Sequence, residues 1–512
     1  MEKLGIIHFL SPLLIYTFLV LINFLLKVWW KPRWIKSALE SEGIKGPPYK
    51  FFHGNSKEIS QLMEKATSRS MELSHDILPK VLPHIHLWTN LYGKNFVNWQ
   101  GSKAELVITE PELIRQMLND KEQFFCKSDI DKYMKKVLGN GLLESEGEKW
   151  TKLRKLANKS FHAESLRNMF PSMIESVETM LERWRDFEGK EMDAHEEFRA
   201  LMAEIISRTA FGSSYLEGQE IFKMLRELVM LSSKNAYKIR LPLISKFSKN
   251  SDDIECERIE KRIRESIIGI MKKREKLRRG EGESFGDDFL GLHLNAHYDS
   301  NENDKISIDD IIDECKTFYS AGHGTTSILL SWTIFLLAIH KDWQEKAREE
   351  VQRLFGQNVP TSEGISRLKT MSMIINESLR LYPPAVYTER KTKKGAKLGN
   401  IKLPANINVQ VPIVAVHHDP TIWGEDANLF NPERFSEGVA AATKNNPAAF
   451  LPFSLGPRTC VGLNFAINEA KITLSMVLQR YAFTLSPVYI HSPIQIVTLR
   501  PQHGIQVVLH SL

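Results

Sequence analysis

The chain has 512 residues, of which 42% are apolar and 25% are charged, an ordinary composition for a globular protein with a sizeable core. Its formal net charge of +6 is small for this length, so no nucleic-acid partner is implied. The four cysteines, Cys126, Cys256, Cys315 and Cys460, lie far apart without a Cys-x-x-Cys pair, which argues against a disulfide framework or a zinc site.

The first predicted element is an uncharged apolar run from Gly5 to Leu26, which as a helix is long enough to span a bilayer. A cleaved signal peptide is the alternative, but bulky and basic residues follow the run where a cleavage site needs small ones. We therefore expect residues 1–30 to be an N-terminal membrane anchor. The basic residues after the run favour a cytosolic location for the rest of the chain.

The next segment, residues 31–55, is predicted to be a basic and proline-containing hinge. Gly46, Pro47 and Pro48 in this segment forbid a continuing helix. Residues 56–512 are then expected to form one large domain.

The pattern of this domain is mainly helical to about residue 380, as in the helical spacing of isoleucines within 254–279. Strand-like alternation appears late, in 401–412 and 504–509, and short strands are expected around 96–109. The sequence therefore predicts a mainly α fold with small β-sheets.

A long helix is predicted from Ser307, whose spacing to Asp310 fits a capping box, to about His340. Its second half is apolar nearly all round, so the helix should be central and buried. Gly322 and Gly324 lie in its interior, where each glycine costs about 1 kcal/mol relative to alanine. Two such glycines imply the close approach of a large group or a local distortion.

The stretch FSLGPRTCVG, Phe453–Gly462, holds the candidate residue Cys460. A lone cysteine is most often a buried core residue. Here, however, Gly456 and Gly462 let the backbone pass close to a flat group, and Arg458 needs a carboxylate or phosphate partner. The apolar helix predicted directly afterwards places the sulfur at a helix N-terminus, which stabilises a thiolate. A thiolate beside a flat, acid-bearing group is what a haem iron with an axial cysteine requires.

On this motif the sequence resembles the cytochrome P450 family of haem-thiolate monooxygenases, and four further motifs match in order along the chain. Their details resemble the plant branch that includes secologanin synthase and oxidases of gibberellins, brassinosteroids and triterpenoids. The resemblance implies the cytochrome P450 fold, preceded by one N-terminal transmembrane helix, with residues 56–512 as the haem-thiolate catalytic domain. It also implies heme b as cofactor, Cys460 as metal ligand and Phe453 as a shield for the sulfur.

One matching motif is NESLRLYPP, in which Glu377 and Arg380 share a helical face. By spacing alone this would be a surface ion pair worth a few tenths of a kcal/mol. The resemblance implies instead a buried pair joined by Arg434 of FNPERF, with a structural rather than a catalytic role.

A second match is KWTKLRK, in which Trp150 and Arg154 lie four residues apart on one helical face. Without the resemblance, the pair would be an arginine stem packed beside a half-buried tryptophan. The resemblance makes both residues partners of the haem propionates, together with Arg390 and Arg458. Two buried carboxylates need several such donors.

The last match lies in the long helix, where the resemblance makes Thr325 and Thr326 catalytic, positioning dioxygen and protons. The family usually has an acid directly before the first threonine, and this chain has Gly324. Dioxygen activation requires protons from a hydroxyl, a carboxylate or ordered water. Either water held by Thr325 or the side chain of His323 substitutes, or oxygen activation is impaired. The alternative functions are a haem-thiolate isomerase or dehydratase, or a catalytically impaired haem-binding protein.

The sequence has no Walker loop, no His-Glu-x-x-His motif and no strand-associated Gly-x-Gly-x-x-Gly motif, so we infer no bound nicotinamide or flavin. The resemblance implies NADPH-cytochrome P450 reductase as a separate electron donor. It further implies insertion of one oxygen atom from O2 into a small apolar, terpenoid-like substrate by a single-pass protein of the endoplasmic reticulum membrane. Substrate contacts are expected from residues 120–145, 215–245, 312–326 and 384–387, and from the turn near Ile490.

Overall fold

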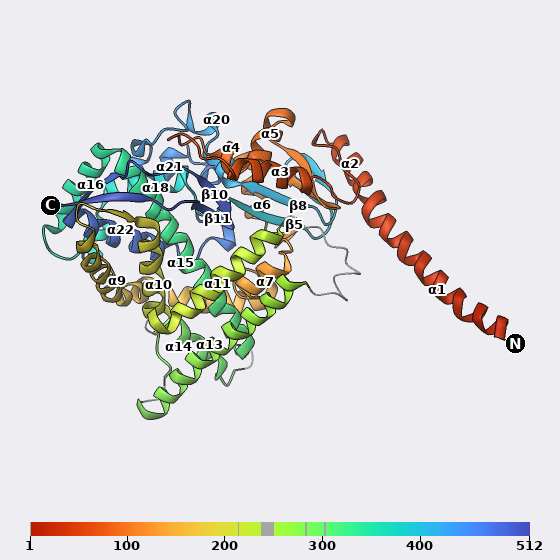
Figure 1. Ribbon diagram of the computed structural model, residues 1–512, viewed down its shortest axis with the longest axis horizontal. Coiled ribbons are helices and arrows are strands. Elements are labelled where there is room, and N and C mark those ends of the chain that lie inside the picture. The colour runs from red at the N-terminus through yellow and green to blue at the C-terminus, as the bar shows by residue number, and fades with distance from the viewer. Residues whose placement is uncertain (1, 213–214, 237–249, 282–283, 302–303) are drawn as a thin grey trace.

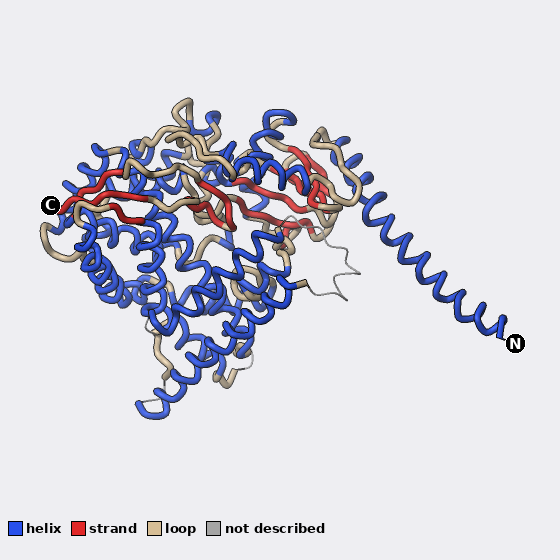
Figure 2. The backbone as a smooth tube through the Cα atoms, in the orientation of Figure 1, coloured by secondary structure: helices blue, strands red, loops and turns tan. Residues whose placement is uncertain are grey.

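The computed structural model describes residues 2–212, 215–236, 250–281, 284–301 and 304–512. Helices make up most of this part of the chain, and the strands gather in small sheets (Figure 2). The predicted mainly α fold with small sheets is confirmed.

The strands form one five-stranded sheet, one three-stranded sheet and two hairpins within the described residues. The five-stranded sheet has the order β1-β2-β8-β5-β3, in which β2 and β8 are parallel and the other neighbours are antiparallel. The strands expected near 96–109, in 401–412 and in 504–509 are all present. The bounds are β1 Phe96–Gln100, β2 Lys103–Val107, β3 Phe125–Cys126, β4 Glu191–Asp193, β5 Tyr387–Thr392, β6 Ala396–Leu398, β7 Ile401–Leu403, β8 Asn408–Pro412, β9 Tyr481–Leu485, β10 Pro493–Ile496, β11 Thr498–Pro501 and β12 Gln506–Ser511.

The helices of the domain enclose these sheets on several sides. The predicted helix in 254–279 is confirmed as α13. The bounds are α3 Ser56–Thr67, α4 Leu78–Val81, α5 Pro83–Tyr92, α6 Pro111–Leu118, α7 Lys132–Leu138, α8 Gly147–Ser160, α9 Ala163–Trp184, α10 Ala194–Phe211, α11 Tyr215–Asn235, α13 Ser251–Glu281, α14 Phe289–His297, α15 Ile308–Ile339, α16 Lys341–Phe355, α17 Ser362–Ser366, α18 Lys369–Leu381, α19 Ile413–His417, α20 Pro420–Trp423, α21 Gly438–Ala442 and α22 Leu463–Arg480, with short 3₁₀ turns η2 Arg185–Phe187, η3 Pro432–Phe435, η4 Pro447–Ala449 and η5 Gly456–Arg458.

The N-terminal helix α1, Glu2–Leu25, extends away from the body of the molecule (Figure 1). A π-helical turn, η1 Leu26–Trp30, joins it to α2, Lys31–Ser41, whose Ile35 and Leu39 are buried beside β2. The helix ends before the Gly-Pro-Pro sequence, as expected, but the first half of the predicted hinge is a packed helix. The stretch Leu14–Ser41 is long and apolar enough to cross a membrane.

The central helix is α15, and its predicted start at Ser307 is confirmed. The Ser307 hydroxyl accepts a hydrogen bond from the Asp310 backbone, and the Asp310 carboxylate accepts one from the Ser307 backbone, which completes the capping box. The stretch Thr326–Ala338 is buried without interruption, and α10, α18 and α22 pack against the helix. It also passes the length and apolarity test for a membrane span, but its burial identifies it as a core helix.

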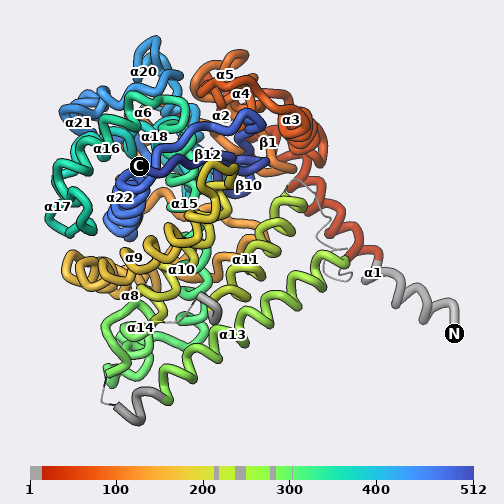
Figure 3. The backbone as a smooth tube through the Cα atoms, turned by 60° about the vertical axis from the view of Figure 1, so that its left-hand side comes forward, coloured from red at the N-terminus to blue at the C-terminus, as the bar shows by residue number. Residues whose placement is uncertain are grey.

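Two contacts in this core position the candidate site. The first is between α15 and α22, and the loop that contains Cys460 leads directly into α22. The second is between α10 and α15. On the outside, α11 and α13 lie side by side across the molecule (Figure 3).

Candidate functional site

The cysteine loop is a tight turn held by its own backbone. The N–H of Cys460 donates to the carbonyl oxygen of Phe453 over 2.9 Å, and η5 fills the turn between them. Gly456 has φ +78°, and an added Cβ there would lie 2.3 Å from the carbonyl oxygen of Leu118. Only glycine tolerates both conditions, which explains the first glycine of the motif.

Cys460 is the one exposed cysteine among the four, all of which are free. Although Cys460 is partly accessible, surrounding protein atoms dehydrate its side chain, and this burial raises the pKa of the Cys460 thiol. The backbone N–H of Gly462 and the charge of Arg154 lower that pKa, in that order. The backbone at the helix N-terminus therefore favours the thiolate, as expected, but burial has the larger effect on the pKa.

Helix α8 brings Trp150 and Arg154 to this loop. Arg154 donates from Nη1 to the carbonyl oxygen of Thr459 over 2.7 Å, and the guanidinium of Arg458 lies 5.0 Å from the centroid of the Trp150 ring. Arg458 in turn donates from Nη2 to the carbonyl oxygen of Ser145 over 2.7 Å. The structure thus joins the second predicted motif to the cysteine loop.

Arg390, on β5, completes the group of predicted propionate partners. Its side chain is buried, and burial, followed by the nearby charge of Arg458, lowers the pKa of Arg390 to about 10. The acids that offset this repulsion are Glu144 and Glu146. Glu144 already pairs with Lys127 at 3.5 Å.

The surplus of positive charge fits an acid-bearing group. Arg154, Arg390, Arg458 and Lys127 interact electrostatically within one neighbourhood whose acids are Glu144, Glu146 and Glu389, so positive charge remains in excess. The propionates of a haem would offset this excess. Together with the exposed Cys460, the donor set fits a thiolate-ligated haem.

The middle of α15 is partly accessible as well. Ala321 is exposed and the four residues after it are half-buried, whereas everything from Thr326 to Ala338 is buried. An ideal Cβ on Gly324 meets no atom within 4 Å, so this residue faces open space. Gly322 instead allows the close approach of α10, because its Cβ would lie 3.0 Å from the Ile206 side chain. Only the second glycine is therefore available for a large ligand.

The polar side chains of this stretch point in different directions. The Thr325 hydroxyl donates to the carbonyl oxygen of Ala321 over 2.8 Å and is only half-buried, whereas Thr326 is buried. The ring of His323 lies 4.9 Å from the ring of Phe222 on α11, and burial lowers the pKa of His323 to about 3. His323 is thus neutral and packed against α11.

The predicted structural group joins α18 to η3. Arg380 donates from Nε and Nη2 to the two carboxylate oxygens of Glu377, each over 2.7 Å, and both side chains are fully buried. Arg434 lies 3.5 Å from the same carboxylate and also pairs with Asp426 at 2.5 Å. By the geometry, this group is an ionic link between α18 and the segment before the cysteine loop.

One buried acid was absent from the sequence prediction. Glu469, on α22, is 1% exposed and interacts with the Thr326 side chain of α15. Its signal in the sequence is an acid within the apolar stretch that follows Cys460. Nothing local distinguishes a buried acid there from a solvated one, because the contact with α15 is tertiary.

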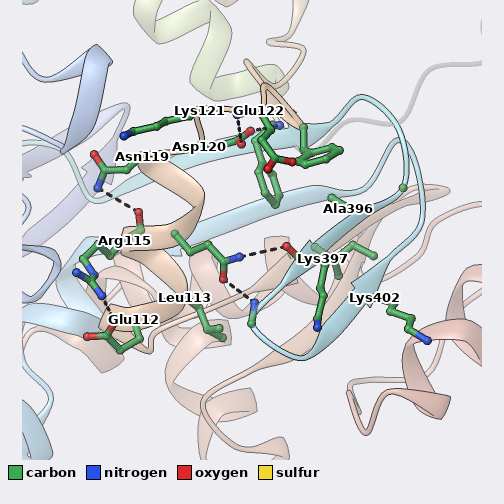
Figure 4. Close-up of a pocket in the computed structure, with 16 residues that line it drawn as sticks. Glu112, Leu113, Arg115, Asn119, Asp120, Lys121, Glu122, Ala396, Lys397 and Lys402 are labelled. Atoms are coloured by element: carbon green, nitrogen blue, oxygen red, sulfur yellow. Dashed lines mark hydrogen bonds and ion pairs between the residues drawn. The ribbon is translucent and has the colours of Figure 1, made fainter.

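A separate surface groove of about 1140 Å³ lies between α6 and the β6–β7 hairpin (Figure 4). The side chain of Gln116 bridges its walls, since its Oε1 accepts from the N–H of Gly399 over 2.7 Å and its Nε2 donates to the carbonyl oxygen of Lys397. The lining mixes acidic and basic side chains and includes none of the predicted catalytic or haem-binding residues, although it contains residues 120–122, 124 and 125 of the predicted substrate segment 120–145. The predicted substrate segment 215–245 lies partly outside the described residues.

Comparison with known proteins matches residues 81–508 to the family model of Cytochrome P450. "Cytochrome P450 CYP749A22" of Panax ginseng is 53% identical over 506 residues, which cover 98% of this chain and 96% of that protein. "11-oxo-beta-amyrin 30-oxidase" of Glycyrrhiza uralensis is 41% identical, with 95% of this chain and 94% of that protein covered. "Secologanin synthase 1" of Catharanthus roseus is 40% identical, with 94% of each chain covered.

Proposed function

Because the chain belongs to the cytochrome P450 family of monooxygenases, we propose that it inserts one oxygen atom from O2 into an apolar, terpenoid-like small molecule. Electrons come from NADPH through a separate NADPH-cytochrome P450 reductase. The observation that carries the proposal is the exposed Cys460 in a loop held by Arg154, together with the partly exposed stretch of α15 around Gly324.

The cofactor is heme b, which when bound supplies the redox-active iron at which dioxygen is activated. Cys460 would ligate its iron, Phe453 would shield the sulfur, and Trp150, Arg154, Arg390 and Arg458 would hold the propionates. The excess of positive charge around these arginines supports this assignment. Thr325 would hold water through its hydroxyl, because this side chain is only half-buried.

The substrate class rests on the relatives. Two of the relatives are named for the oxidation of 11-oxo-beta-amyrin and for the synthesis of secologanin. Pocket side chains, rather than the fold, decide the substrate, so the proposal extends to the class only. Residues 120–145, 312–326 and 384–387 and the turn near Ile490 supply the contacts.

The proposed partners are the membrane and the reductase, and the reductase is expected on the same membrane face as the catalytic domain. The apolar helix α1 is followed by Lys27, Lys31 and Arg33, and the Arg33 guanidinium lies 3.8 Å from the centroid of the Trp29 ring. Basic residues and interfacial tryptophans after a span favour the cytosolic face. The protein is therefore placed in the endoplasmic reticulum membrane as a single-pass protein, with residues 56–512 as the cytosolic catalytic domain.

The experiment is a two-part assay of the full chain in lipid nanodiscs. The reduced protein under carbon monoxide should give the Soret band of a thiolate-ligated haem. With reductase and NADPH, a panel of terpenoids should then yield a product heavier by one oxygen atom. Cys460→Ser should abolish both signals, whereas Cys126→Ser, which preserves a donor to the Lys391 carbonyl, should leave both intact.

A Soret band typical of a neutral axial ligand would overturn the role of Cys460. Conversion of a terpenoid without NADPH or a gain of oxygen would instead favour an isomerase or dehydratase. These outcomes are separable because the first concerns the ligand and the second concerns the reaction.

A further inference from the structure

The N-terminal half of α15 carries a polar face inside the protein, formed by Asp313, Glu314, Thr317 and Ser320. These residues recur at helical spacing, so their side chains lie along one side of the helix. Glu314 is fully buried and Thr317 is buried as well. All four contact the segment 137–142, which leads from the end of α7 into the loop before α8.

The contacts of this polar face are made to the backbone of the segment and not to its side chains. Oε1 of Glu314 accepts a hydrogen bond from the backbone N–H of Leu142. The other three contacts join the Ser320 hydroxyl to the Val137 carbonyl oxygen over 3.4 Å, the Thr317 hydroxyl to the Leu138 carbonyl oxygen over 2.7 Å, and the Asp313 carboxylate to the Asn140 backbone N–H.

Two glycines allow the segment to approach this face. Gly139 has φ +68°, and an added Cβ there would lie 2.6 Å from Oδ1 of Asp313. A Cβ on Gly141 would lie 2.5 Å from both Oε1 of Glu314 and the Thr317 hydroxyl oxygen. A larger residue at either position would push the backbone away from the helix, so the spacing of the glycines matches the polar face.

The second carboxyl oxygen of Glu314 faces a buried histidine on α14. Nδ1 of His293 donates to the carbonyl oxygen of Phe289 over 2.7 Å, and its Nε2 lies 3.5 Å from Oε2 of Glu314. Both side chains are fully buried, and neither of these two atoms has another partner among the described residues. Helix α14 also packs against α8 (Figure 3). Glu314 is thus fixed between the segment on one side and α14 on the other.

The segment continues to the cysteine loop through its own turn. The backbone N–H groups of Glu144 and Ser145 donate to the carbonyl oxygen of Gly141 over 3.1 and 2.8 Å. The carbonyl oxygen of Ser145 then accepts the hydrogen bond from Arg458. The predicted substrate segment 120–145 is therefore attached to α15 and to the cysteine loop at two successive points.

We propose that Glu314 is a positioning residue that fixes the substrate segment 120–145 and thereby determines which carbon of the substrate is oxidised. The proposal rests on the proposed monooxygenase function. Glu314 acts through Leu142 and not by touching the substrate or the haem. Displacement of reacting groups by about 1 Å can cost about a hundredfold in rate, so a loose segment would affect the reaction. The cysteine loop has separate support from Arg154, so haem binding should not depend on Glu314.

Four substitutions in the full-length haem-loaded protein separate this role from general stability. Glu314→Leu removes both oxygens at similar size. Glu314→Gln keeps an oxygen for Leu142 and offers an amide N–H to His293, so it should recover most of the loss. Thr317→Val removes one donor with little change of shape and should fold even if Glu314→Leu does not. Asp309→Asn is the matched control, because Asp309 is on the same helix but exposed.

Hydrogen exchange followed by mass spectrometry measures the position of the segment without turnover. In Glu314→Leu, the amides of 137–146 should exchange about tenfold faster, because Leu142 loses its acceptor. Thr317→Val should give a smaller increase in the same amides. Those of 453–462 should keep their rate, and the reduced protein under carbon monoxide should keep the thiolate Soret band. Asp309→Asn should match the wild type throughout.

Turnover with reductase and a terpenoid that the wild type oxidises completes the test. Glu314→Leu should raise KM by about tenfold, lower kcat less, and place oxygen on more than one carbon. Unchanged exchange in 137–146, or an unchanged KM with a single product, would overturn the proposal. Faster exchange across the whole chain in both Glu314→Leu and Thr317→Val would also overturn it, since the role would then be stability alone. If the wild type oxidises no terpenoid, the proposed function fails, and hydrogen exchange still decides whether Glu314 fixes the segment.

Discussion

Arg380 and Glu377 form a two-pronged ion pair in the core, with both N···O distances at 2.7 Å and neither side chain exposed. Nη1 of Arg380 also donates to the carbonyl oxygens of His417 and Ala427, over 2.8 and 2.7 Å. The pair therefore satisfies backbone groups from a segment more than thirty residues further along the chain. Removal of one partner leaves a buried charge and unpaired carbonyl groups.

Glu377→Gln is expected to destabilise the protein by about 3–5 kcal/mol, because it leaves the Arg380 charge unpaired in the core. Chemical denaturation followed by tryptophan fluorescence measures the change. Glu112→Gln is the matched control, since Glu112 and Arg115 have the same spacing but are both largely exposed. That change should cost less than about 1 kcal/mol. Equal effects of the two substitutions would contradict the structural role of the buried pair.

Gly324→Ala and Gly322→Ala should differ in stability although both lie in the interior of α15. An alanine gains about 1 kcal/mol over glycine in a helix interior, and the new methyl at Gly324 meets no neighbour within 4 Å. The methyl at Gly322 would instead lie 3.0 Å from Ile206 and cancel part or all of the gain. Thermal unfolding should show the higher midpoint for Gly324→Ala, and a higher midpoint for Gly322→Ala would refute the assignment of the two glycine faces.

Arg390→Gln should weaken haem retention. If Arg390 pairs with a propionate in the interior, its loss costs on the order of 2 kcal/mol, or about thirtyfold in haem affinity. Transfer of haem to an excess of apomyoglobin, followed by absorbance, measures the loss rate. Lys391→Gln is the neighbouring control, because Lys391 pairs with exposed Asp129 instead. Equal haem loss from the two variants would remove Arg390 from the propionate group.

Stability should fall as pH rises, owing to a buried carboxyl on β2. Burial first, and then the charge of Glu389, raise the pKa of Glu105 from its ordinary 4.5 to about 8. Between these values the unfolded chain releases this proton and the folded protein retains it, so the free energy of unfolding decreases with increasing pH. The contribution is fully present below pH 4.5 and is lost by about pH 8.

Glu105→Gln should remove this slope, because glutamine does not titrate and can still accept a hydrogen bond from Gln100 or Gln410. Urea midpoints across the same pH window provide the comparison. Glu112→Gln, at an exposed position, should keep the wild-type slope. A difference between wild type and Glu105→Gln that does not change with pH would show that Glu105 does not titrate in this window.

The local sequence was sufficient for elements whose signal is short in range. The capping box at Ser307, the alternating strand in 401–412 and the helix that starts after Gly462 each follow from neighbouring residues. The cysteine loop was also recognisable, because the glycines, arginine and cysteine occur within ten positions. Their roles as haem partners remain predictions, although the structure brings these residues together.

Cross-strand and cross-helix relationships were not predictable in the same way. Glu105 and Glu389 are hundreds of residues apart, and Gln410, which lies between them on β8, contacts both carboxyl groups at 3.5 and 3.2 Å. The antiparallel register of β5 and β8 places Glu389 opposite Gln410. No periodicity in one segment contains that register, so the coupled acids became visible only in the folded sheet.

The sequence alone determined the family resemblance, the mainly helical fold, the apolar N-terminal helix and the absence of an acid at Gly324, because each depends on residue identity and short spacing. Tertiary structure decided which side chains share an environment. Burial raised the pKa of Glu469 well above its usual range, the contact between α15 and α22 brought it near Thr326, and helix packing directed His323 to Phe222. Charge state and proximity depend on desolvation and on contacts between distant segments, which only the folded chain creates.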